Sequence, residues 1–224
     1  PRRSSLRLLA TASSFDQLKK NYPAISERLK EIELELLSKD DFQHKTQREF
    51  SKQKMNFVRP PTDLLLLSGP LSFFTVDDLW KDLEKKNLRL LILDQVTDLG
   101  NAAAIARTAS FFAVDYLILT GKNSFSLTPS FYRNASGAAE SLKFCQVNSL
   151  PSFVSKLQKK EVNCVGFSEH AEYPDLLTSP VNVDKSQSVA LLLGAEQTGL
   201  SHAICNSNYL NQKFLIKLML FLLV

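Results

Sequence analysis

The stretch LDQVTDLGNAAAIARTAS, residues 93–110, decides the fold because an apolar run ends in it and a helix begins. The run that leads into it, LRLLIL, is apolar apart from one arginine, as in a strand buried on both faces of a sheet. A turn follows Asp94, and the pattern predicts a helix over residues 101–113 with Asn101 as its N-cap. The stretch therefore predicts a strand–turn–helix unit of the kind that builds parallel α/β sheets.

The predicted helix consists mainly of small residues and carries one long cation, Arg107. At about 100° per residue, Arg107 falls opposite the sheet between Ala103 and Ser110, on a face without bulk where another molecule can approach. Asn101 lies at the carboxyl end of the strand, the edge at which open parallel sheets bind ligands. The helix alone favours a plainer interpretation, an N-cap and a surface charge, because alanine-rich surface helices are common. The residues expected to face the sheet are Ala102, Ile105, Ala109 and Phe112.

The alternation of strands and helices continues along the chain. The predicted strands are DYLILT (115–120), VNCVGFS (162–168) and SVALLLG (188–194), and the predicted helices are SLPSFVSKLQKK (149–160) and GLSHAIC (199–205). This order implies a parallel sheet with helical crossovers. The segment KFLIKLM (213–219) is a candidate for a further strand.

The N-terminal third shows weaker signals. Residues 25–37 are predicted as one amphipathic helix, because apolar residues recur there at helical spacing. Residues 38–54 are charged and form either a linker or a polar helix. Two prolines in RPPTD (59–63) mark a boundary. After it, LLLLSGPL (64–71) is predicted as a strand, and TVDDLWKDLEKK (75–86) as a helix that Thr75 caps.

The composition is that of a soluble globular protein, with 44% hydrophobic and 22% charged residues. The net charge of +4 permits an anionic partner such as RNA without requiring one.

Residues 1–14 are basic and rich in serine, which is typical of a mitochondrial transit segment; a basic arm, with or without RNA binding, is the alternative. Three cysteines and three histidines follow no ligand spacing, so we expect no metal site. Apolar runs are too short for a membrane span.

A second stretch, VALLLGAEQTGLS (189–201), is a predicted buried strand that opens into a glycine loop. Gly194 and Gly199 allow close approach to a ligand or a positive φ, and Glu196 between them can accept hydrogen bonds. Taken alone, this stretch is weak evidence for a binding loop, because a plain strand–turn–helix junction has the same pattern.

Together and in this order, the two stretches resemble the SpoU/TrmH family of RNA ribose 2′-O-methyltransferases, members of the SPOUT superfamily of α/β trefoil-knot enzymes. Between them, NASGAAESL (134–142) resembles a serine–glycine–alanine segment of the family, and KNSFSLTPSFYRNASGAAE (122–140) is most similar to mitochondrial large-subunit rRNA guanosine 2′-O-methyltransferases. GPLSFFTVDDLW (69–80) resembles the junction between the family's substrate-binding and catalytic domains. The resemblance covers roughly residues 62–209.

The resemblance implies methyl transfer from S-adenosylmethionine to a ribose 2′-hydroxyl. It gives Arg107 and Asn101 catalytic roles and brings Arg107 and Ser136 to the RNA. It further implies a homodimer in which Arg107 reaches the partner's cofactor. Since a guanidinium stays protonated, we expect Arg107 to hold a phosphate and stabilise the developing alkoxide rather than act as a base. The expected cofactor-binding residues are Leu193, Gly194, Ala195, Glu196 and Gly199.

The family's third motif, which contributes to the knot and the cofactor site, has no counterpart after Tyr209, so the C-terminal knot segment looks truncated. This leaves two alternatives to the rRNA enzyme: an inactive RNA-binding scaffold, and a tRNA 2′-O-methyltransferase. The expected organisation is a transit segment (1–14), a helical or α+β substrate-binding region (15–86) and an incomplete methyltransferase domain (87–224). Localisation is expected to be mitochondrial, or otherwise cytoplasmic.

Overall fold

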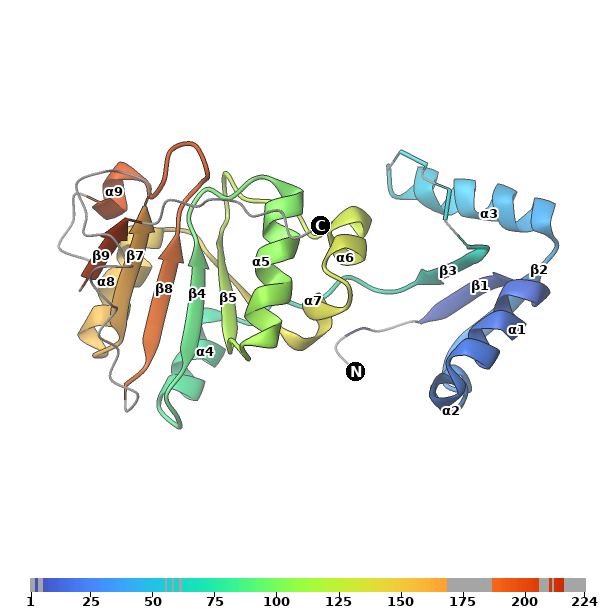
Figure 1. Cartoon of the computed structure of the whole chain (residues 1–224), viewed down its shortest axis with the longest axis horizontal. Helices are drawn as coiled ribbons and strands as arrows, with labels where there is room; N and C mark the ends of the chain where they lie inside the picture. Colours follow the sequence, from blue (N-terminus) through green and yellow to red (C-terminus); the bar gives the residue numbers. More distant parts are fainter. Residues whose placement is uncertain are drawn as a thin grey trace. The chain divides into compact units, whose positions relative to one another are not determined.

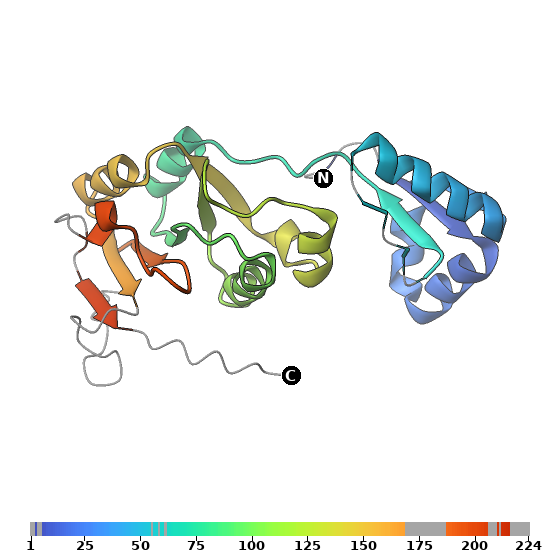
Figure 2. The same cartoon turned by 90° about the horizontal axis from the view of Figure 1, so that it is seen from above.

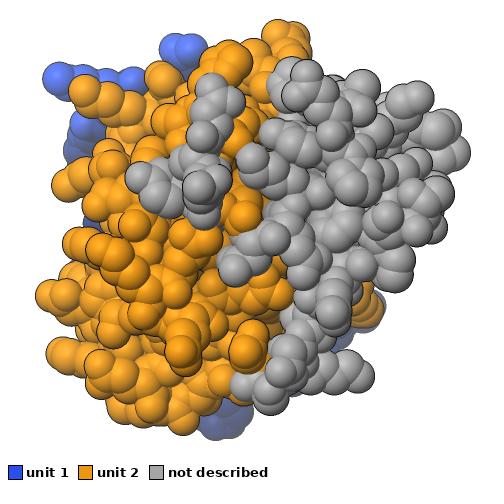
Figure 3. Space-filling model, turned by 90° about the vertical axis from the view of Figure 1, so that its left-hand side faces the viewer, with its two compact units in different colours: residues 1–72 blue, residues 73–224 orange. Residues whose placement is uncertain are grey.

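A computed structural model of the chain describes residues 3, 6–54, 56–57, 59–60, 62–168, 187–205, 210 and 212–215. The chain divides into two compact units, unit 1 (residues 1–72) and unit 2 (residues 73–224), which Figure 3 distinguishes by colour. The domain boundary expected from the sequence lies 14 residues further on, between residues 86 and 87. The segment between the two positions contains a helix that packs in unit 2.

Unit 1 is a small sheet with helices on both faces (Figure 1). The strand order is β2-β1-β3, with β1 parallel to β2 and antiparallel to β3. Leu9 of the central strand is fully buried, and so is Thr46 of the long helix α3. The elements in chain order are β1 (Arg7–Thr11), α1 (Ala12–Asn21), the 3-10 turn η1 (Pro23–Ile25), α2 (Ser26–Leu29), β2 (Glu33–Leu37), α3 (Lys39–Lys52) and β3 (Leu64–Leu67).

The prediction of one helix over residues 25–37 is wrong. Two short helical turns, η1 and α2, are followed by β2. The error arises because Glu33, Leu34, Glu35 and Leu36 alternate with period two, which a strand paired with β1 satisfies, while the leucines also fit helical spacing. The polar-helix alternative for residues 38–54 is confirmed by α3, whose N-cap Ser38 accepts a hydrogen bond from the Asp41 amide.

The expected transit segment overlaps folded structure. Residues 7–11 form β1, the middle strand of its sheet, with Leu8, Leu9 and Ala10 buried. Removal of residues 1–14 would take this strand away and separate β2 from β3. Residues 7–11 thus belong to the sheet of unit 1, and the assignment of residues 1–14 as a transit segment stays a prediction.

Unit 2 is built on a parallel sheet in the order β6-β5-β4-β8-β7-β9, and all its strand pairs are parallel, which confirms the predicted α/β class. Its elements are α4 (Val76–Leu83), β4 (Arg89–Leu93), α5 (Leu99–Phe111), β5 (Tyr116–Thr120), α6 (Pro129–Asn134), α7 (Ala138–Ser141), β6 (Lys143–Val147), α8 (Leu150–Lys159), β7 (Asn163–Ser168), β8 (Val189–Leu193), α9 (His202–Cys205) and β9 (Gln212–Leu215). Thr75 caps α4 as predicted, in a capping box with Asp78.

Helices cover both faces of this sheet. Figures 1 and 2 show α5 on one face and α4 and α8 on the other. The main core lies on the α8 side, where Ile92, Ile118 and Leu192 from three neighbouring strands pack with Phe153 and Leu157. This arrangement leaves the carboxyl ends of β4 and β8, which are neighbours in the sheet, to form a common edge.

Candidate functional site

The candidate site is built from the two segments that follow β4 and β8. The first leads into α5, and its N-cap is Asp98, whose Oδ1 accepts a hydrogen bond from the Asn101 amide (2.7 Å). The predicted N-cap, Asn101, is therefore wrong by three residues, because an aspartate upstream of it caps the helix. As a result the Asn101 side chain is available, and its Nδ2 donates to Glu196 Oε2 (3.0 Å), which joins the two segments.

The second segment is a tight glycine loop. The amide of Ala195 donates to the Gly199 carbonyl (3.0 Å), and the amide of Gly199 donates back to the Ala195 carbonyl (2.8 Å). Gly199 has φ +64°, a conformation that favours glycine. A Cβ on Gly194 would lie 2.0 Å from the Gly199 carbonyl carbon, so the chain needs glycine there. The loop is thus closed at its base and presents residues 196–198 at an exposed tip.

Asp94 is a residue of this site that the sequence pattern did not single out. It follows β4 directly, is 3% exposed, and accepts a hydrogen bond on Oδ2 from the Ser201 amide (2.7 Å). Ser201 precedes α9, so the buried carboxylate fixes the far end of the glycine loop. The signal that could have found it is an aspartate placed directly after a fully buried strand, at the ligand-binding edge of the sheet.

Arg107 is exposed on α5, as predicted, and its Nη1 donates to the main-chain carbonyl of Asn134 (2.8 Å). That carbonyl ends α6, where a cation is favoured by the helix dipole. Ser136, two residues further on, is exposed with φ +49° and precedes Gly137 at φ +84°. The structure therefore brings Arg107 to the segment that contains Ser136.

The predicted environment of Arg107 is partly wrong. Ala103, expected on its open face, is fully buried, and Phe112, expected against the sheet, is 62% exposed. The first difference arises because α6 and α7 pack along α5, where Ser110 Oγ hydrogen bonds Ser141 Oγ (2.7 Å). The second arises because α5 ends at Phe111. Ala102 and Ala109 are buried as predicted, and Ile105 is half-buried.

The site thus consists of two groups: the Asn101–Glu196 pair, and Arg107 with the segment after α6. In the described part of the chain, no hydrogen bond joins Arg107 to Asn101 or Glu196. Arg107 uses one N–H on Asn134, so its remaining donors can bind an anion such as phosphate. The Asn101–Glu196 pair offers a carboxylate and an amide oxygen that can accept hydrogen bonds from hydroxyl or ammonium groups.

Two cysteines, Cys145 and Cys164, are buried in strands of unit 2. Burial raises the pKa of Cys145 to about 11 and that of Cys164 to about 12, so both thiols stay protonated near neutral pH. No group of three or more His, Cys, Asp or Glu side chains within the described ranges could hold a metal ion. Among the helices of those same ranges, none combines the length and the apolar character that a membrane crossing requires.

The expectation that the third motif is missing falls mostly on residues outside the described ranges. Of the segment after Tyr209, the structure describes residue 210 and residues 212–215, which form β9 beside β7 and confirm a strand in the candidate segment KFLIKLM.

Comparison with known proteins identifies the family to which this site belongs. Residues 88–214, more than half of the chain, match the model of the SpoU rRNA Methylase family. Among curated relatives, the mitochondrial rRNA methyltransferase 1 of Dictyostelium discoideum is 30% identical over 179 residues, covering 66% of this chain and 33% of that protein. The 23S rRNA (guanosine-2′-O-)-methyltransferase RlmB of Acinetobacter baylyi is 38% identical over 113 residues, covering 50% of this chain and 44% of that protein. The chain thus spans less than half of the length of these two relatives.

Solved structures show the same fold. The SpoU methyltransferase AviRb of Streptomyces viridochromogenes, in complex with the cofactor AdoMet, aligns with a TM-score of 0.65 and 21% identity, covering 96% of this chain and 74% of that one. An rRNA methyltransferase of Sinorhizobium meliloti aligns with a TM-score of 0.62 and 18% identity, covering 95% and 71%.

Proposed function

The chain belongs to the SpoU rRNA methylase family, and on this premise we propose that it transfers a methyl group from S-adenosylmethionine to a ribose 2′-hydroxyl of RNA. The observation that carries the proposal is the hydrogen bond between Asn101 and Glu196, two residues 95 positions apart. It joins the segments after β4 and β8, the two stretches on which the family resemblance rests. Because the two segments meet at one edge of the sheet, we assign the reaction to that edge.

The glycine loop suits the cofactor. Its exposed tip offers the Glu196 carboxylate, an acceptor for ammonium or ribose hydroxyl groups, while Leu193 and Ala195 are half-buried apolar neighbours for an adenine ring. Gly194 and Gly199 hold the loop closed, and Asp94 fixes its far end. When bound, S-adenosylmethionine supplies an electrophilic methyl group on a sulfonium. The residues proposed to bind it are Leu193, Gly194, Ala195, Glu196 and Gly199.

Arg107 is proposed to act on the RNA side. Its bond to Asn134 fixes one edge of the guanidinium and leaves the other donors for a phosphate and for the alkoxide that develops on the ribose. Asn101, held by Glu196, keeps an amide oxygen that can orient the ribose. Methyl transfer is an in-line displacement, so this positioning accounts for much of the rate. Ser136, next to the Arg107 anchor, is proposed to contact the RNA.

A homodimer would complete the site. Arg107 is exposed and makes no hydrogen bond to the Asn101–Glu196 pair of its own chain. A two-fold symmetric partner could bring its own glycine loop to this arginine, so that each site takes groups from both chains. We infer a shared site of this kind from the separation of the two groups.

The names of the relatives support a finer proposal. RlmB proteins are named for guanosine 2′-O-methylation of 23S rRNA, and the Dictyostelium relative is named a mitochondrial rRNA methyltransferase. We therefore propose guanosine of large-subunit rRNA in mitochondria as the substrate, with an RNA-binding surface located within residues 15–86. The folded state of β1 means that this localisation rests on the relative and not on residues 1–14.

The proposal is tested with Arg107→Ala and a matched variant, Arg28→Ala, which removes an exposed arginine of α2 in unit 1. Methyl transfer from labelled S-adenosylmethionine to rRNA is expected to fall by about 10²- to 10³-fold in the first variant, as for loss of one donor to a developing oxyanion. Cofactor affinity should stay near that of the wild type, and the Arg28→Ala protein should keep its activity. Unchanged turnover in Arg107→Ala would contradict the assigned role.

A further inference from the structure

The net charge of the chain is unevenly divided. Residues 1–72 contain 13 lysines and arginines against nine aspartates and glutamates, whereas residues 73–224 contain 14 of each. The whole excess of +4 therefore belongs to unit 1, while the proposed catalytic residues belong to unit 2. A polyanion is thus attracted to the unit that does not carry the proposed chemistry.

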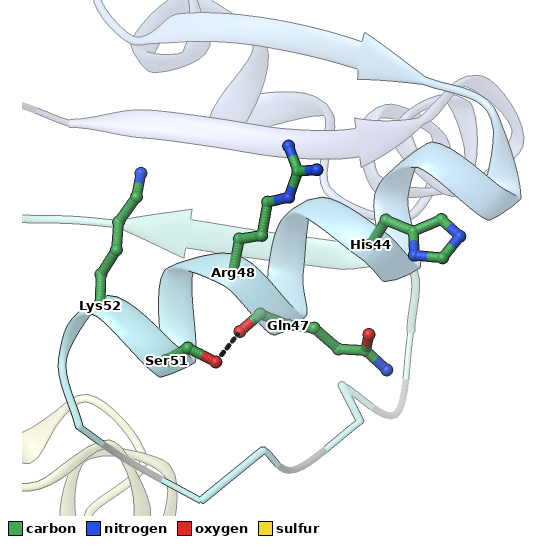
Figure 4. Close-up of a pocket in the computed structure, with 5 residues that line it drawn as sticks. All are labelled: His44, Gln47, Arg48, Ser51 and Lys52. Carbon is green, nitrogen blue, oxygen red and sulfur yellow. Dashed lines mark hydrogen bonds between the residues drawn. The ribbon is translucent and has the colours of Figure 1, made fainter.

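Within unit 1, helix α3 has a buried side and a cationic side. Phe42 and Thr46 are buried toward the sheet. The opposite side holds a shallow depression, drawn in Figure 4, where Arg48 and Lys52 extend from the helix in the same direction. The residues that line the depression are His44, Gln47, Arg48, Ser51 and Lys52.

Two of the three carboxylates of α3 are already hydrogen-bonded, and the third, Asp40, lies in the first turn of the helix, away from Arg48 and Lys52. Asp41 accepts a hydrogen bond from Ser38 at the N-cap (2.7 Å). Glu49 is held by Arg7 (3.3 Å) and Lys52 (2.9 Å), and its side chain is only 13% exposed. Lys52 itself remains 69% exposed, and Arg48 has no ion-pair partner among the described residues. The outward charge of the C-terminal half of this helix, which carries Arg48 and Lys52, is therefore positive.

The spacing of these cations suits an extended row of phosphates. His44, Arg48 and Lys52 are four residues apart, so they lie along one side of the helix at a rise of about 6 Å per step. Arg48 offers the planar fork that binds phosphate through two N–H groups, and Lys52 offers a point charge. Ser51 donates to the Gln47 carbonyl (3.0 Å), which leaves its oxygen able to accept from a sugar hydroxyl.

We propose that the outer face of α3, centred on Arg48 and Lys52, binds the phosphate backbone of the RNA substrate. The inference rests on the proposed function, which makes RNA the partner. It adds the particular surface of unit 1 and its mode of contact, which is electrostatic and tolerant of sequence. An acidic protein on the same face is the competing occupant.

The test compares Arg48→Gln/Lys52→Gln with a variant of equal net charge, Lys19→Gln/Lys20→Gln. The control changes α1, which lies on the other face of the unit 1 sheet (Figure 1). Binding of a fluorescein-labelled RNA hairpin by the full chain is measured by anisotropy between about 50 and 200 mM salt. Circular dichroism confirms that each variant is folded.

The α3 variant is expected to bind the hairpin about 10- to 100-fold more weakly at the lowest salt, and the slope of log affinity against log salt should decrease in magnitude by about 1.5 for the two lost contacts. The α1 variant should keep both values within about twofold of the wild type. Equal losses in the two variants would show that only net charge matters, and an unchanged slope in the α3 variant would remove this face from the RNA. Wild-type protein that does not bind the hairpin would also overturn the inference and leave an acidic protein as the occupant.

Failure of the proposed function is distinguishable from failure of this inference. If the wild type binds RNA through α3 but transfers no methyl group, the surface stands and the enzymatic proposal falls. If the α3 variant binds RNA and methylates it as the wild type does, the enzymatic proposal stands and the surface falls.

Discussion

Replacement of Gly194 by alanine tests the glycine loop as the cofactor site. The new Cβ would lie 2.0 Å from the Gly199 carbonyl carbon, 2.2 Å from its oxygen and 2.3 Å from the Leu200 amide nitrogen. All three are main-chain atoms, so the loop must open and lose the two hydrogen bonds between Ala195 and Gly199. Overpacking of this kind costs about 1–3 kcal/mol, and each lost hydrogen bond costs about 0.5–1.5 kcal/mol.

The closed loop should therefore be destabilised by about 3 kcal/mol, which weakens S-adenosylmethionine binding about 100-fold. Calorimetric titration of the full chain measures this change, and circular dichroism checks that the fold persists. Gly121→Ala is the control, because the one close contact of its Cβ would be the end of the Gln146 side chain (3.1 Å), which can rotate away, while Asn148 Oδ1 (3.7 Å) and the Val147 carbonyl oxygen (3.9 Å) lie at ordinary van der Waals distance. Wild-type affinity in Gly194→Ala would refute the assignment of the loop.

Three further predictions follow from individual contacts. A hydrogen bond from Lys143 lowers the pKa of Asp82. Ionised Asp82 therefore stabilises the fold at pH values above its ordinary pKa of 3.8, and this contribution disappears as the pH falls through the lowered pKa. Urea unfolding at several pH values should show that Asp82→Asn is less stable than the wild type at neutral pH and loses less stability in acid. Asp94→Ala should cost about 1.5–3 kcal/mol of unfolding free energy and weaken cofactor binding, whereas Asp94→Asn keeps an acceptor and should recover part of both; equal losses would exclude the acceptor role. If the site is shared in a dimer, an equal mixture of inactive Arg107→Ala and Glu196→Gln chains should regain about a quarter of wild-type methyl transfer, because about half of the dimers are mixed and one of the two sites in each mixed dimer is intact. No recovery in verified mixed dimers would place each site within one chain.

The sequence predicts the sheet of unit 2 well because its central strands are continuous apolar runs buried on both faces. The edge strand β6 was not predicted, since its sequence KFCQV mixes polar and apolar residues in the way an edge position allows. In β2 the alternation of glutamate and leucine competes with helical spacing over the same residues, and pairing with β1 decides between them. Such pairing is a long-range contact that a local pattern does not contain.

The candidate site was predicted in its residue types but not in its connections. Arg107 and the two glycines stand out by spacing and composition. The bonds from Asn101 to Glu196 and from Ser201 to Asp94 join positions about a hundred residues apart, so they appear only when β4 and β8 are neighbours. The helix cap was misplaced because both Asp98 and Asn101 are good N-cap residues, and only the fold selects Asp98.

The most direct test of the central claim is nucleoside analysis of the product. Large-subunit rRNA, transcribed without modification, is incubated with the full chain and S-adenosylmethionine, digested to nucleosides and examined by mass spectrometry. We predict a ribose-methylated nucleoside, 2′-O-methylguanosine, whose formation depends on Arg107. Methylation of a base instead of a ribose, or no ribose methylation by folded protein that binds both the cofactor and the RNA, would contradict the account.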